Sequence, residues 1–282
     1  MNIFEITEDN IEQYGSYIDP DAAEYLAREY YHGFVNCDDE EPVAAIIYEI
    51  LYSEDDNRDT EERVIWLRID DDAAGQELLD SFCDYSDTDS VSKIICDIEP
   101  GDKDRYSDFF VRSGFSLQEI EDQSITVTLG DFREIRFARS LYSPEFIKSL
   151  DEIGRRTFRR GLVDCVYNIN RVFPDDLTML PIEWFDTDIS CFDEADGQSY
   201  GFLLFHRSYS GIYHVELLAD WGTDAKHSLL FMIRYSLSKA YETLPDDTKL
   251  VINRYDAGSK ALCDLVFPGV HGASCIRAVR TH

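Results

Sequence analysis

The sequence lacks the features that mark a membrane protein, a secreted protein or a zinc protein. It has no run of about 18 to 20 uncharged apolar residues, so no segment is expected to cross a bilayer. Met1–Tyr14 has no basic stretch before its first acidic residues, which argues against a secretory signal. The seven cysteines include no Cys-x-x-Cys pair, so neither zinc ribbons nor disulfide frameworks are expected. These absences predict a cytoplasmic protein with reduced thiols and no metal site.

Positive charge is scarce, and it is unevenly distributed. The 282 residues include 26 lysines and arginines against 57 aspartates and glutamates, a net charge of −31. Residues 1–132 contain 8 lysines and arginines and 36 aspartates and glutamates, a net charge of −28. The remaining residues carry a net charge of −3. Such a surface repels phosphate backbones and anionic lipid, so neither nucleic acid nor a membrane is expected as a partner. A charge that only maintains solubility explains the same composition, and both interpretations can hold.

Apolar residues are plentiful enough for a buried core. The chain is 44% hydrophobic and 13% aromatic, which excludes a disordered protein. Its length suits one large domain or two domains of about 140 residues.

Strand and helix patterns follow the same order in the two halves. In the first half they are strands at Pro42–Tyr52 and Arg63–Ile69, a helix at Ala73–Tyr85, a strand at Lys93–Ile98, a helix at Asp102–Arg112 and a strand near Ser124–Leu129. In the second half they are strands at Tyr200–Arg207 and Ile212–Ala219, a helix at Ala225–Tyr241, a strand at Lys249–Arg254, a helix at Ser259–Val266 and a strand at Ala273–Val279.

Each half also begins with a strand followed by helices. These are Asn2–Thr7 before Ile11–Tyr31, and Glu134–Ala138 before Pro144–Val166. The repeated order predicts the α/β class, with a mixed, mostly antiparallel sheet and helices on both faces in each domain. The charge changes near Gly130–Arg133, so we expect two domains, 1–132 and 133–282.

Three segments carry a resemblance to a known superfamily. They are FFVRSGF (Phe109–Phe115), VELLADWGTDAKHSLLFMI (Val215–Ile233) and LPIEWFDTDISCFDEADGQSYGFLLFHR (Leu180–Arg207). Together with the order of the elements, they resemble the GNAT superfamily of acyl-CoA-dependent N-acyltransferases, present here as a tandem of two degenerate domains. The resemblance implies acetyl-CoA or another acyl-CoA as cofactor.

The resemblance also implies where such a cofactor binds. In the superfamily the fourth strand parts from the fifth, and the following loop directs its amides at the pyrophosphate from a helix N-terminus. In the first half this loop is Asp70-Asp71-Asp72, which repels a pyrophosphate, so no CoA is expected there. In the second half the implied cofactor-binding residues are Leu217, Leu218, Ala219, Gly222, Thr223, Ala225, Lys226 and His227. Asp224 opposes an anion, and an ordinary helix N-cap explains the same loop.

Glu216 is the candidate catalytic base that the resemblance implies. Strand alternation is expected to put it on the face opposite Val215 and Leu217, and the aligned residue of the first half, Ile65, cannot accept a proton. A solvent-facing strand residue is the alternative interpretation.

Other candidate groups are weaker. The position of the superfamily's proton-donating tyrosine holds Phe110 and Leu265, and the nearby Tyr106 and Tyr255 are out of register. Three histidines lie on different predicted elements without the spacing of metal ligands, and are expected to be structural or surface residues: His206, His214 and His227. The basic cluster Arg155–Arg160 is expected to contact an anionic ligand, to pair with the acidic half or to stay solvated.

Two functions are therefore expected. The first is an N-acyltransferase whose second half transfers an acyl group from acyl-CoA to a small-molecule or peptide amine. The second is a binding or scaffold protein that keeps the fold without catalysis. The sequence specifies neither the acceptor nor the oligomeric state.

Overall fold

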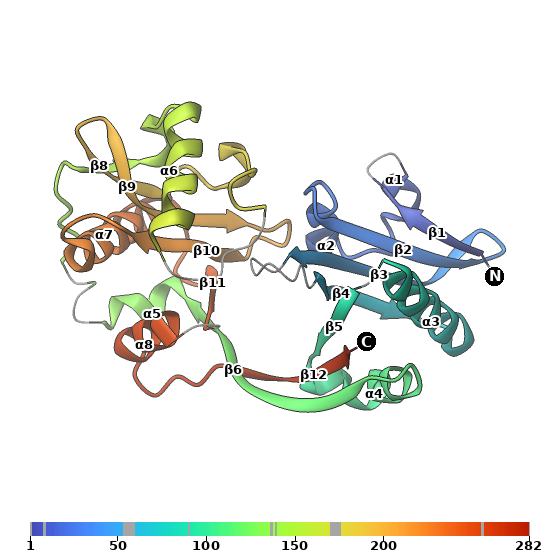
Figure 1. The fold of residues 1–282 in the computed structure, drawn as a ribbon. Coiled ribbons are helices and arrows are strands. Elements are labelled where there is room, and N and C mark those ends of the chain that lie inside the picture. The colour runs from blue at the N-terminus through green and yellow to red at the C-terminus, as the bar shows by residue number, and fades with distance from the viewer. Residues whose placement is uncertain are drawn as a thin grey trace. The chain divides into compact units, whose positions relative to one another are not determined.

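The computed structural model describes the whole chain apart from residues 1, 8–9, 53–59, 90, 136–137, 139, 170–175, 255–256 and 282. The chain divides into two compact units. Unit 1 consists of Met1–Glu121 together with Ser274–His282, and unit 2 consists of Asp122–Ala273. Both units combine strands with helices (Figure 1), which confirms the expected α/β class with mixed sheets.

Unit 1 is built on a sheet with the strand order β1-β2-β3-β4-β5-β12. Its strands are β1 Asn2–Ile6, β2 Tyr31–Asp38, β3 Glu41–Tyr52, β4 Thr60–Ile69, β5 Val91–Ile98 and β12 Ala273–Thr281. Its helices are α1 Ile11–Tyr14, α2 Pro20–Tyr25, α3 Asp72–Thr88, the short η1 Pro100–Asp102 and α4 Lys103–Arg112. The β4–β5 pair is parallel and the other pairs are antiparallel.

Unit 2 repeats this arrangement with the strand order β6-β11-β10-β9-β8-β7. Its strands are the second part of β6 Ser116–Thr128, then β7 Ile147–Ser149, β8 Cys191–Ala195, β9 Gln198–Arg207, β10 Tyr213–Asp220 and β11 Lys249–Asn253. Its helices are α5 Leu129–Arg133, η3 Leu150–Glu152, α6 Arg155–Asn168, η4 Ile182–Trp184, α7 Ala225–Thr243 and α8 Ala257–Val266. Here β10–β11 is the parallel pair.

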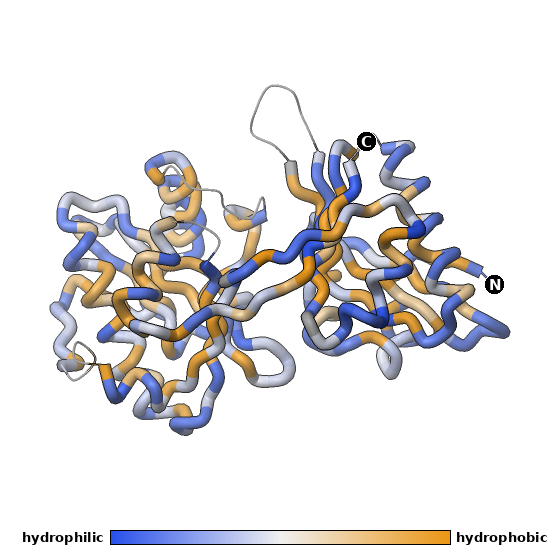
Figure 2. The backbone as a smooth tube through the Cα atoms, turned by 90° about the horizontal axis from the view of Figure 1, so that it is seen from below, coloured by the Kyte–Doolittle hydropathy of each residue, from blue (hydrophilic) through white to orange (hydrophobic). Residues whose placement is uncertain are grey.

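Helices cover both faces of each sheet, as the repeated pattern predicted. In unit 1, α3 and α4 pack in one buried cluster, whereas α1 and α2 pack in another on the opposite face. Leu78, Leu79 and Phe82 form the buried face of α3 that the sequence periodicity predicted. In unit 2, α7 and α8 pack on one face and α6 packs on the other. Figure 2 shows the hydrophobic stretches of the strands inside each unit.

The last strands of the two halves are exchanged. The sequence pattern suggested that Ser124–Leu129 and Ala273–Val279 each complete the sheet of their own half. Instead, residues 124–128 of β6 pair with β11 in unit 2, and residues 276–281 of β12 pair with β5 in unit 1. The units therefore divide after Glu121 rather than at residue 132, and the C-terminal strand belongs to unit 1. Periodicity identifies a strand but does not identify its partner.

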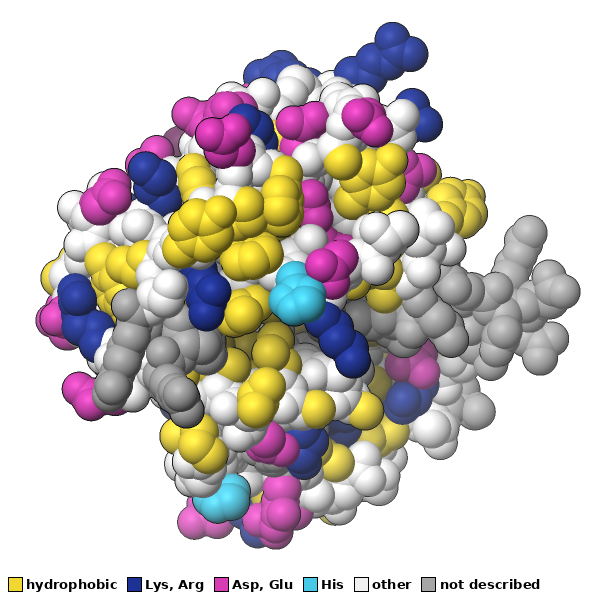
Figure 3. All heavy atoms as spheres, turned by 90° about the vertical axis from the view of Figure 1, so that its left-hand side faces the viewer, with side chains coloured by type: hydrophobic (Ala, Val, Ile, Leu, Met, Phe, Trp, Pro, Cys, Tyr) yellow, Lys and Arg dark blue, Asp and Glu magenta, His cyan; other side chains and the backbone are white. Residues whose placement is uncertain are grey.

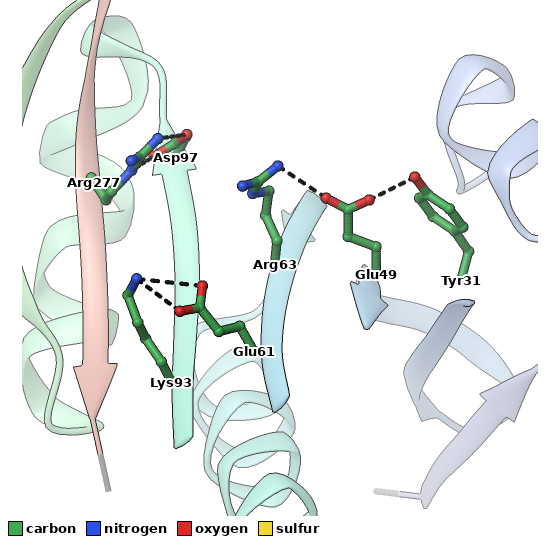
Figure 4. A network of polar contacts seen from close by, with 7 residues as sticks. All are labelled: Tyr31, Glu49, Glu61, Arg63, Lys93, Asp97 and Arg277. Carbon is green, nitrogen blue, oxygen red and sulfur yellow. Dashed lines mark hydrogen bonds and ion pairs between the residues drawn. The ribbon is translucent and has the colours of Figure 1, made fainter. Parts of the chain in front are cut away.

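Polar contacts between neighbouring strands accompany these pairings in unit 1 (Figure 4). Arg277 on β12 donates two hydrogen bonds, of 2.6 and 2.7 Å, to the carboxylate of Asp97 on β5. The other contacts are Tyr31 to Glu49 at 2.6 Å, Arg63 to Glu49 at 3.1 Å and Lys93 to Glu61 at 3.3 Å. The Arg277–Asp97 pair adds a side-chain contact to the six residue pairs between β12 and β5.

Three strands of the structure were not predicted, and one predicted strand is not found at its described residues. β2, β7 and β8 were not predicted, and β7 lies inside Pro144–Val166, which was predicted to be helical. β7 has only three residues, too few to show an alternation. The segment Glu134–Ala138 was predicted to be a strand. Glu134 and Ile135 instead form a turn directly after α5, and Ala138 is not in a strand either. Residues 136–137 lie outside the described part of the chain.

The cysteines are unpaired thiols, and six of the seven are buried. Among the described residues, no group of histidine, cysteine and carboxylate side chains could hold a metal ion. No described helix combines the length and the apolar character that a bilayer crossing requires.

Candidate functional site

β10 of unit 2 contains a β-bulge at Glu216. Val215 pairs with Phe205 and Leu217 with Leu204 on the neighbouring β9, so Glu216 is the extra residue between two consecutive pairs. A bulge locally bends a strand and redirects a side chain, and bulges are frequent beside active sites.

The bulge changes which face of the sheet the side chains of β10 lie on, compared with the sequence prediction. Alternation placed Val215 and Leu217 on the same face, but an inserted residue reverses the alternation beyond it. Val215 and Leu218 pack with the α7–α8 cluster, whereas Leu217 and Ala219 pack with the α6 cluster. The prediction that Val215 and Leu217 share a face was therefore wrong.

β10 also separates from β11 just before the bulge. The two strands pair in parallel at Tyr213↔Leu250 and His214↔Val251, and the described residues record no further pair between them. The main chain of Leu217–Ala219 is therefore without a strand partner on that side. This is the strand separation that the GNAT resemblance implied.

Two histidines and a tryptophan lie beside this bulge. His206 on β9 pairs directly across from His214 on β10, with ring centroids 6.5 Å apart. Trp184 stacks on the buried His206 at 4.1 Å with the rings nearly parallel, and its main-chain oxygen lies 2.9 Å from His206 Nδ1. The structure therefore groups two histidines that the sequence analysis treated separately.

The loop after β10 is held by its own polar groups. The Asp220 carboxylate accepts the Gly222 N–H at 2.9 Å, and the Trp221 N–H donates to the Tyr200 carbonyl at 2.8 Å. The resemblance assigned the N–H of Gly222 to a pyrophosphate, but in the structure this N–H already donates to a carboxylate.

The first turn of α7 is the other part of the implied phosphate site. Thr223, Lys226 and His227 are exposed there. The Nδ1 atom of His227 lies 2.7 Å from the Asp224 carboxylate, while the Asp224 main-chain oxygen accepts the His227 N–H. The first N–H groups of a helix have no partner within the helix, and with Lys226 they favour an anion. Asp224 opposes it, as the sequence indicated.

An acidic pair lies beneath the same loop. Asp193 on β8 and Asp220 on β10 both lie beside Gly201 of β9. A Cβ at Gly201 would lie 2.5 Å from Asp220 Oδ2, so only glycine leaves room for this carboxylate. Burial raises the pKa of Asp220, and the neighbouring Asp193 carboxylate raises it further, although the Gly222 N–H opposes the shift.

An apolar cavity of about 80 Å³ lies on the α7–α8 face of this strand separation. Val215 and Leu218 of β10, Ile252 of β11, Leu237 of α7 and Cys263 of α8 are among its lining residues. The cavity is too small for a whole cofactor, but it adjoins the main chain that β11 leaves unpaired.

Unit 1 has the same backbone features with different side chains. Ile65 occupies the bulge of β4, and β4 pairs with β5 only as far as Val64 among the described residues. The Asp71 carboxylate caps α3 by accepting the Ala74 N–H at 2.8 Å, where an anionic ligand would otherwise bind. The absence of CoA binding in unit 1 stays a prediction.

The positions of the superfamily's tyrosine offer no proton donor. Phe110 is fully buried in unit 1, and Leu265 is 77% exposed in unit 2. Tyr106 lies on α4 with its hydroxyl 3.5 Å from the Leu67 main-chain oxygen, and Tyr255 lies outside the described residues.

Three arginines of the basic cluster on α6 have partners within unit 2. Arg155 pairs with Glu183, Arg160 lies 3.7 Å from Asp164, and Arg159 donates to a main-chain oxygen. Figure 3 shows side chains of both charges interspersed with hydrophobic ones on the face it presents.

Three solved structures resemble the chain at low sequence identity. A tandem GNAT protein from the clavulanic acid biosynthesis pathway has a TM-score of 0.62 at 8% identity, covering 99% of this chain and 98% of its own. The glucosamine N-acetyltransferase region of a fungal multidomain GH3 β-N-acetylglucosaminidase has a TM-score of 0.64 at 9% identity, over 99% of this chain and 38% of that one. A GCN5-related N-acetyltransferase from Anabaena variabilis has a TM-score of 0.56 at 11% identity, over 99% of this chain and 73% of that one.

No protein-family profile matches the sequence, and no curated protein matches it. The structural similarity nevertheless extends over both units, and each unit has a bulged strand that separates from its parallel neighbour. The chain therefore has the GNAT fold in tandem, with two GNAT-type units in one polypeptide.

Proposed function

We propose that unit 2 transfers an acyl group from an acyl-CoA to a small-molecule or peptide amine, with Glu216 receiving the amine proton. The observation that carries the proposal is the β10 bulge, which places a carboxylate residue where β10 separates from β11. In unit 1 the bulge residue is Ile65, which cannot accept a proton. Unit 2 is therefore the catalytic unit of the proposal.

The residues of unit 2 suit parts of an acyl-CoA. The apolar cavity beside Leu218 suits the uncharged arm, and the first turn of α7 with Lys226 suits a phosphate. Asp220 and Asp224 weaken the phosphate site. When bound, acyl-CoA supplies the acyl group as an activated thioester.

The chain would contribute polarisation and proton transfer. Main-chain N–H groups of Leu217–Ala219, unpaired on the β11 side, can donate to a carbonyl oxygen. A carboxylate is a far weaker base than an amine, so Glu216 would act as a relay, directly or through water. The rate should therefore rise with pH as the amine loses its proton. Leu265 offers no proton to a departing sulfur, so the thiolate would leave either unprotonated or with a proton from water.

Glu216→Gln tests this role because it removes the base without changing the shape of the side chain. Turnover, measured as CoA release with a panel of amines, should fall by roughly 10²–10⁴. Acetyl-CoA affinity should stay nearly unchanged, because the side chain is not assigned to the phosphates. Glu242→Gln, an exposed substitution on α7, is the matched control and should keep full turnover. Equal turnover in both variants would remove Glu216 from the mechanism.

Cofactor binding is tested separately by thermal unfolding with CoA, acetyl-CoA and longer acyl-CoAs. A ligand at 100 times its dissociation constant stabilises the folded state by about 2.7 kcal/mol, which raises the unfolding temperature by several degrees. No shift at millimolar concentration with any of these ligands would refute the proposal.

A second candidate function is a binding or scaffold protein without turnover. The occupied Gly222 N–H and the absence of a proton donor at Leu265 favour it. An acyl-CoA thermal shift with no CoA release from any amine would support this candidate over catalysis.

A further inference from the structure

Unit 1 contains an open cavity of about 380 Å³, beside Asp70 of the acidic loop at the start of α3. Its walls are the loop between α1 and α2 at Ser16–Pro20, the second half of β4 at Trp66–Arg68, and the start of α4 at Arg105 and Tyr106. Small-molecule sites occupy about 300 to 1,000 Å³, so the volume suits a small ligand.

Two arginines reach this cavity in a unit that is otherwise strongly acidic. Arg68 lies 3.0 Å and Arg105 lies 3.5 Å from the carboxylate of one residue, Asp70. Asp70 is shared by both guanidinium groups, and the second carboxylate at the cavity, Asp19, accepts the Asp21 N–H at 2.8 Å. The Arg68 and Arg105 side chains are 42% and 50% exposed, so a ligand can reach both.

Both guanidinium groups are fixed in place before any ligand arrives. Arg68 lies over the buried Tyr17 ring at 4.2 Å and donates to the Tyr17 main-chain oxygen at 3.0 Å. Arg105 lies 5.1 Å from the Tyr106 ring and donates to the Ile69 main-chain oxygen. Each guanidinium has five N–H donors, so both retain donors for a further acceptor. Fixed donors lose less entropy on binding than mobile ones.

The charges around the cavity select a singly charged ligand. Asp19 lines the same cavity, and Asp70 lies between the arginines, so a doubly charged phosphate meets more repulsion than a carboxylate does. Trp66, the aromatic wall that is only partly buried, suits a flat apolar group attached to that carboxylate.

We propose that this cavity of unit 1 binds a small aromatic carboxylate through Arg68 and Arg105. Binding there is not catalysis, because the bulge residue beside it is Ile65. The proposed site is distinct from the acyl-transfer site of unit 2, and either proposal can fail without the other.

Calorimetric titration of the full chain tests the proposal with three aromatic carboxylates: benzoate, phenylacetate and 4-hydroxybenzoate. At least one should bind with one site per chain, and its neutral amide should bind at least tenfold more weakly. Affinity should fall as NaCl is added, because salt screens the arginines. Failure of all three at millimolar concentration, equal binding of the amide, or tighter binding of inorganic phosphate would overturn the proposal.

Two substitutions on α4 locate the site. Arg105→Gln should weaken carboxylate binding at least tenfold, since it removes a charged hydrogen-bond donor. Arg112→Gln makes the same charge change two turns further along the helix, outside the cavity lining, and should leave affinity unchanged. Thermal unfolding of both variants checks that they remain folded. Equal affinities in the two variants would overturn the assignment.

Discussion

Glu62 is a buried carboxyl whose protonation couples the stability of unit 1 to pH. It lies on β4, 1% exposed, and accepts a hydrogen bond from Ser86 of α3. Burial raises its pKa to about 7 from an ordinary value of 4.5, although the Ser86 hydrogen bond opposes the shift. The folded chain therefore keeps this proton to a higher pH than the unfolded chain does. Its contribution to stability falls as pH rises from about 4.5 and is lost above about 7.

Glu62→Gln should remove this pH dependence, because the amide keeps an acceptor for Ser86 without a charge. At pH 8 the variant should be more stable than the wild type by about 3 kcal/mol or less. Urea unfolding between pH 4.5 and 8 measures the difference. Glu61→Gln is the control, since its side chain is 36% exposed and paired with Lys93. If the unfolding free energy of Glu62→Gln changed with pH in parallel with that of the wild type, Glu62 would not be the source of the pH dependence.

At the scale of elements, the exchanged β12 completes the sheet of unit 1 and contributes Ile276 and Ala278 to its buried core. Ala278 on β12 is fully buried in the α3–α4 cluster and pairs with Cys96 of β5. Ala278→Asp would bury an unpaired charge there and destabilise the fold by about 3 kcal/mol or more. Hydrogen exchange should show faster exchange in β5 and α3 and little change in β10 and α7. Faster exchange confined to β11 and α7 would instead mean that β12 completes the sheet of its own half.

The sequence predicted the kind and order of most elements because their patterns are local. The apolar face of α3 and the two hairpin strands Tyr200–Arg207 and Ile212–Ala219 are examples. The bulge at Glu216 was not predictable, because it depends on the register against β9. The exchange of β6 and β12 was not predictable either, because both strands have the same alternation whichever sheet they join.

The pairing of the two histidines could not be read from the sequence turn alone. A two-residue turn at Ser210–Gly211 would pair His206 with Val215. The structure pairs His206 with His214, because the Ser208 N–H bonds to the Ile212 main-chain oxygen across a loop of three residues. The Arg68–Arg105 cavity had no sequence signal either, because its three walls are distant in sequence and are brought together only by folding.

For the whole molecule, the uneven charge predicts an uneven response to salt. Unit 1 holds 10 lysines and arginines against 34 aspartates and glutamates, so it carries −24 of the total −31. Self-repulsion of this size destabilises a compact state, and salt screens it. Raising NaCl from about 0.05 M to about 0.5 M, where the screening length falls below about 5 Å, should slow hydrogen exchange in α3 more than in α7. Faster exchange in α3 at high salt would mean that its ion pairs outweigh the repulsion.

The exchanged strand also governs when a newly made chain can finish folding. β5 ends at Ile98, but its partner β12 begins at Ala273, so the ribosome must add everything between them first. At 5 to 20 residues per second this takes roughly 9 to 35 seconds. Throughout that interval the β5 edge stands without β12, and an open strand edge can pair with a neighbouring nascent chain. The unit that is synthesised first is thus the one completed last, so its β5 edge stays open throughout the synthesis of unit 2.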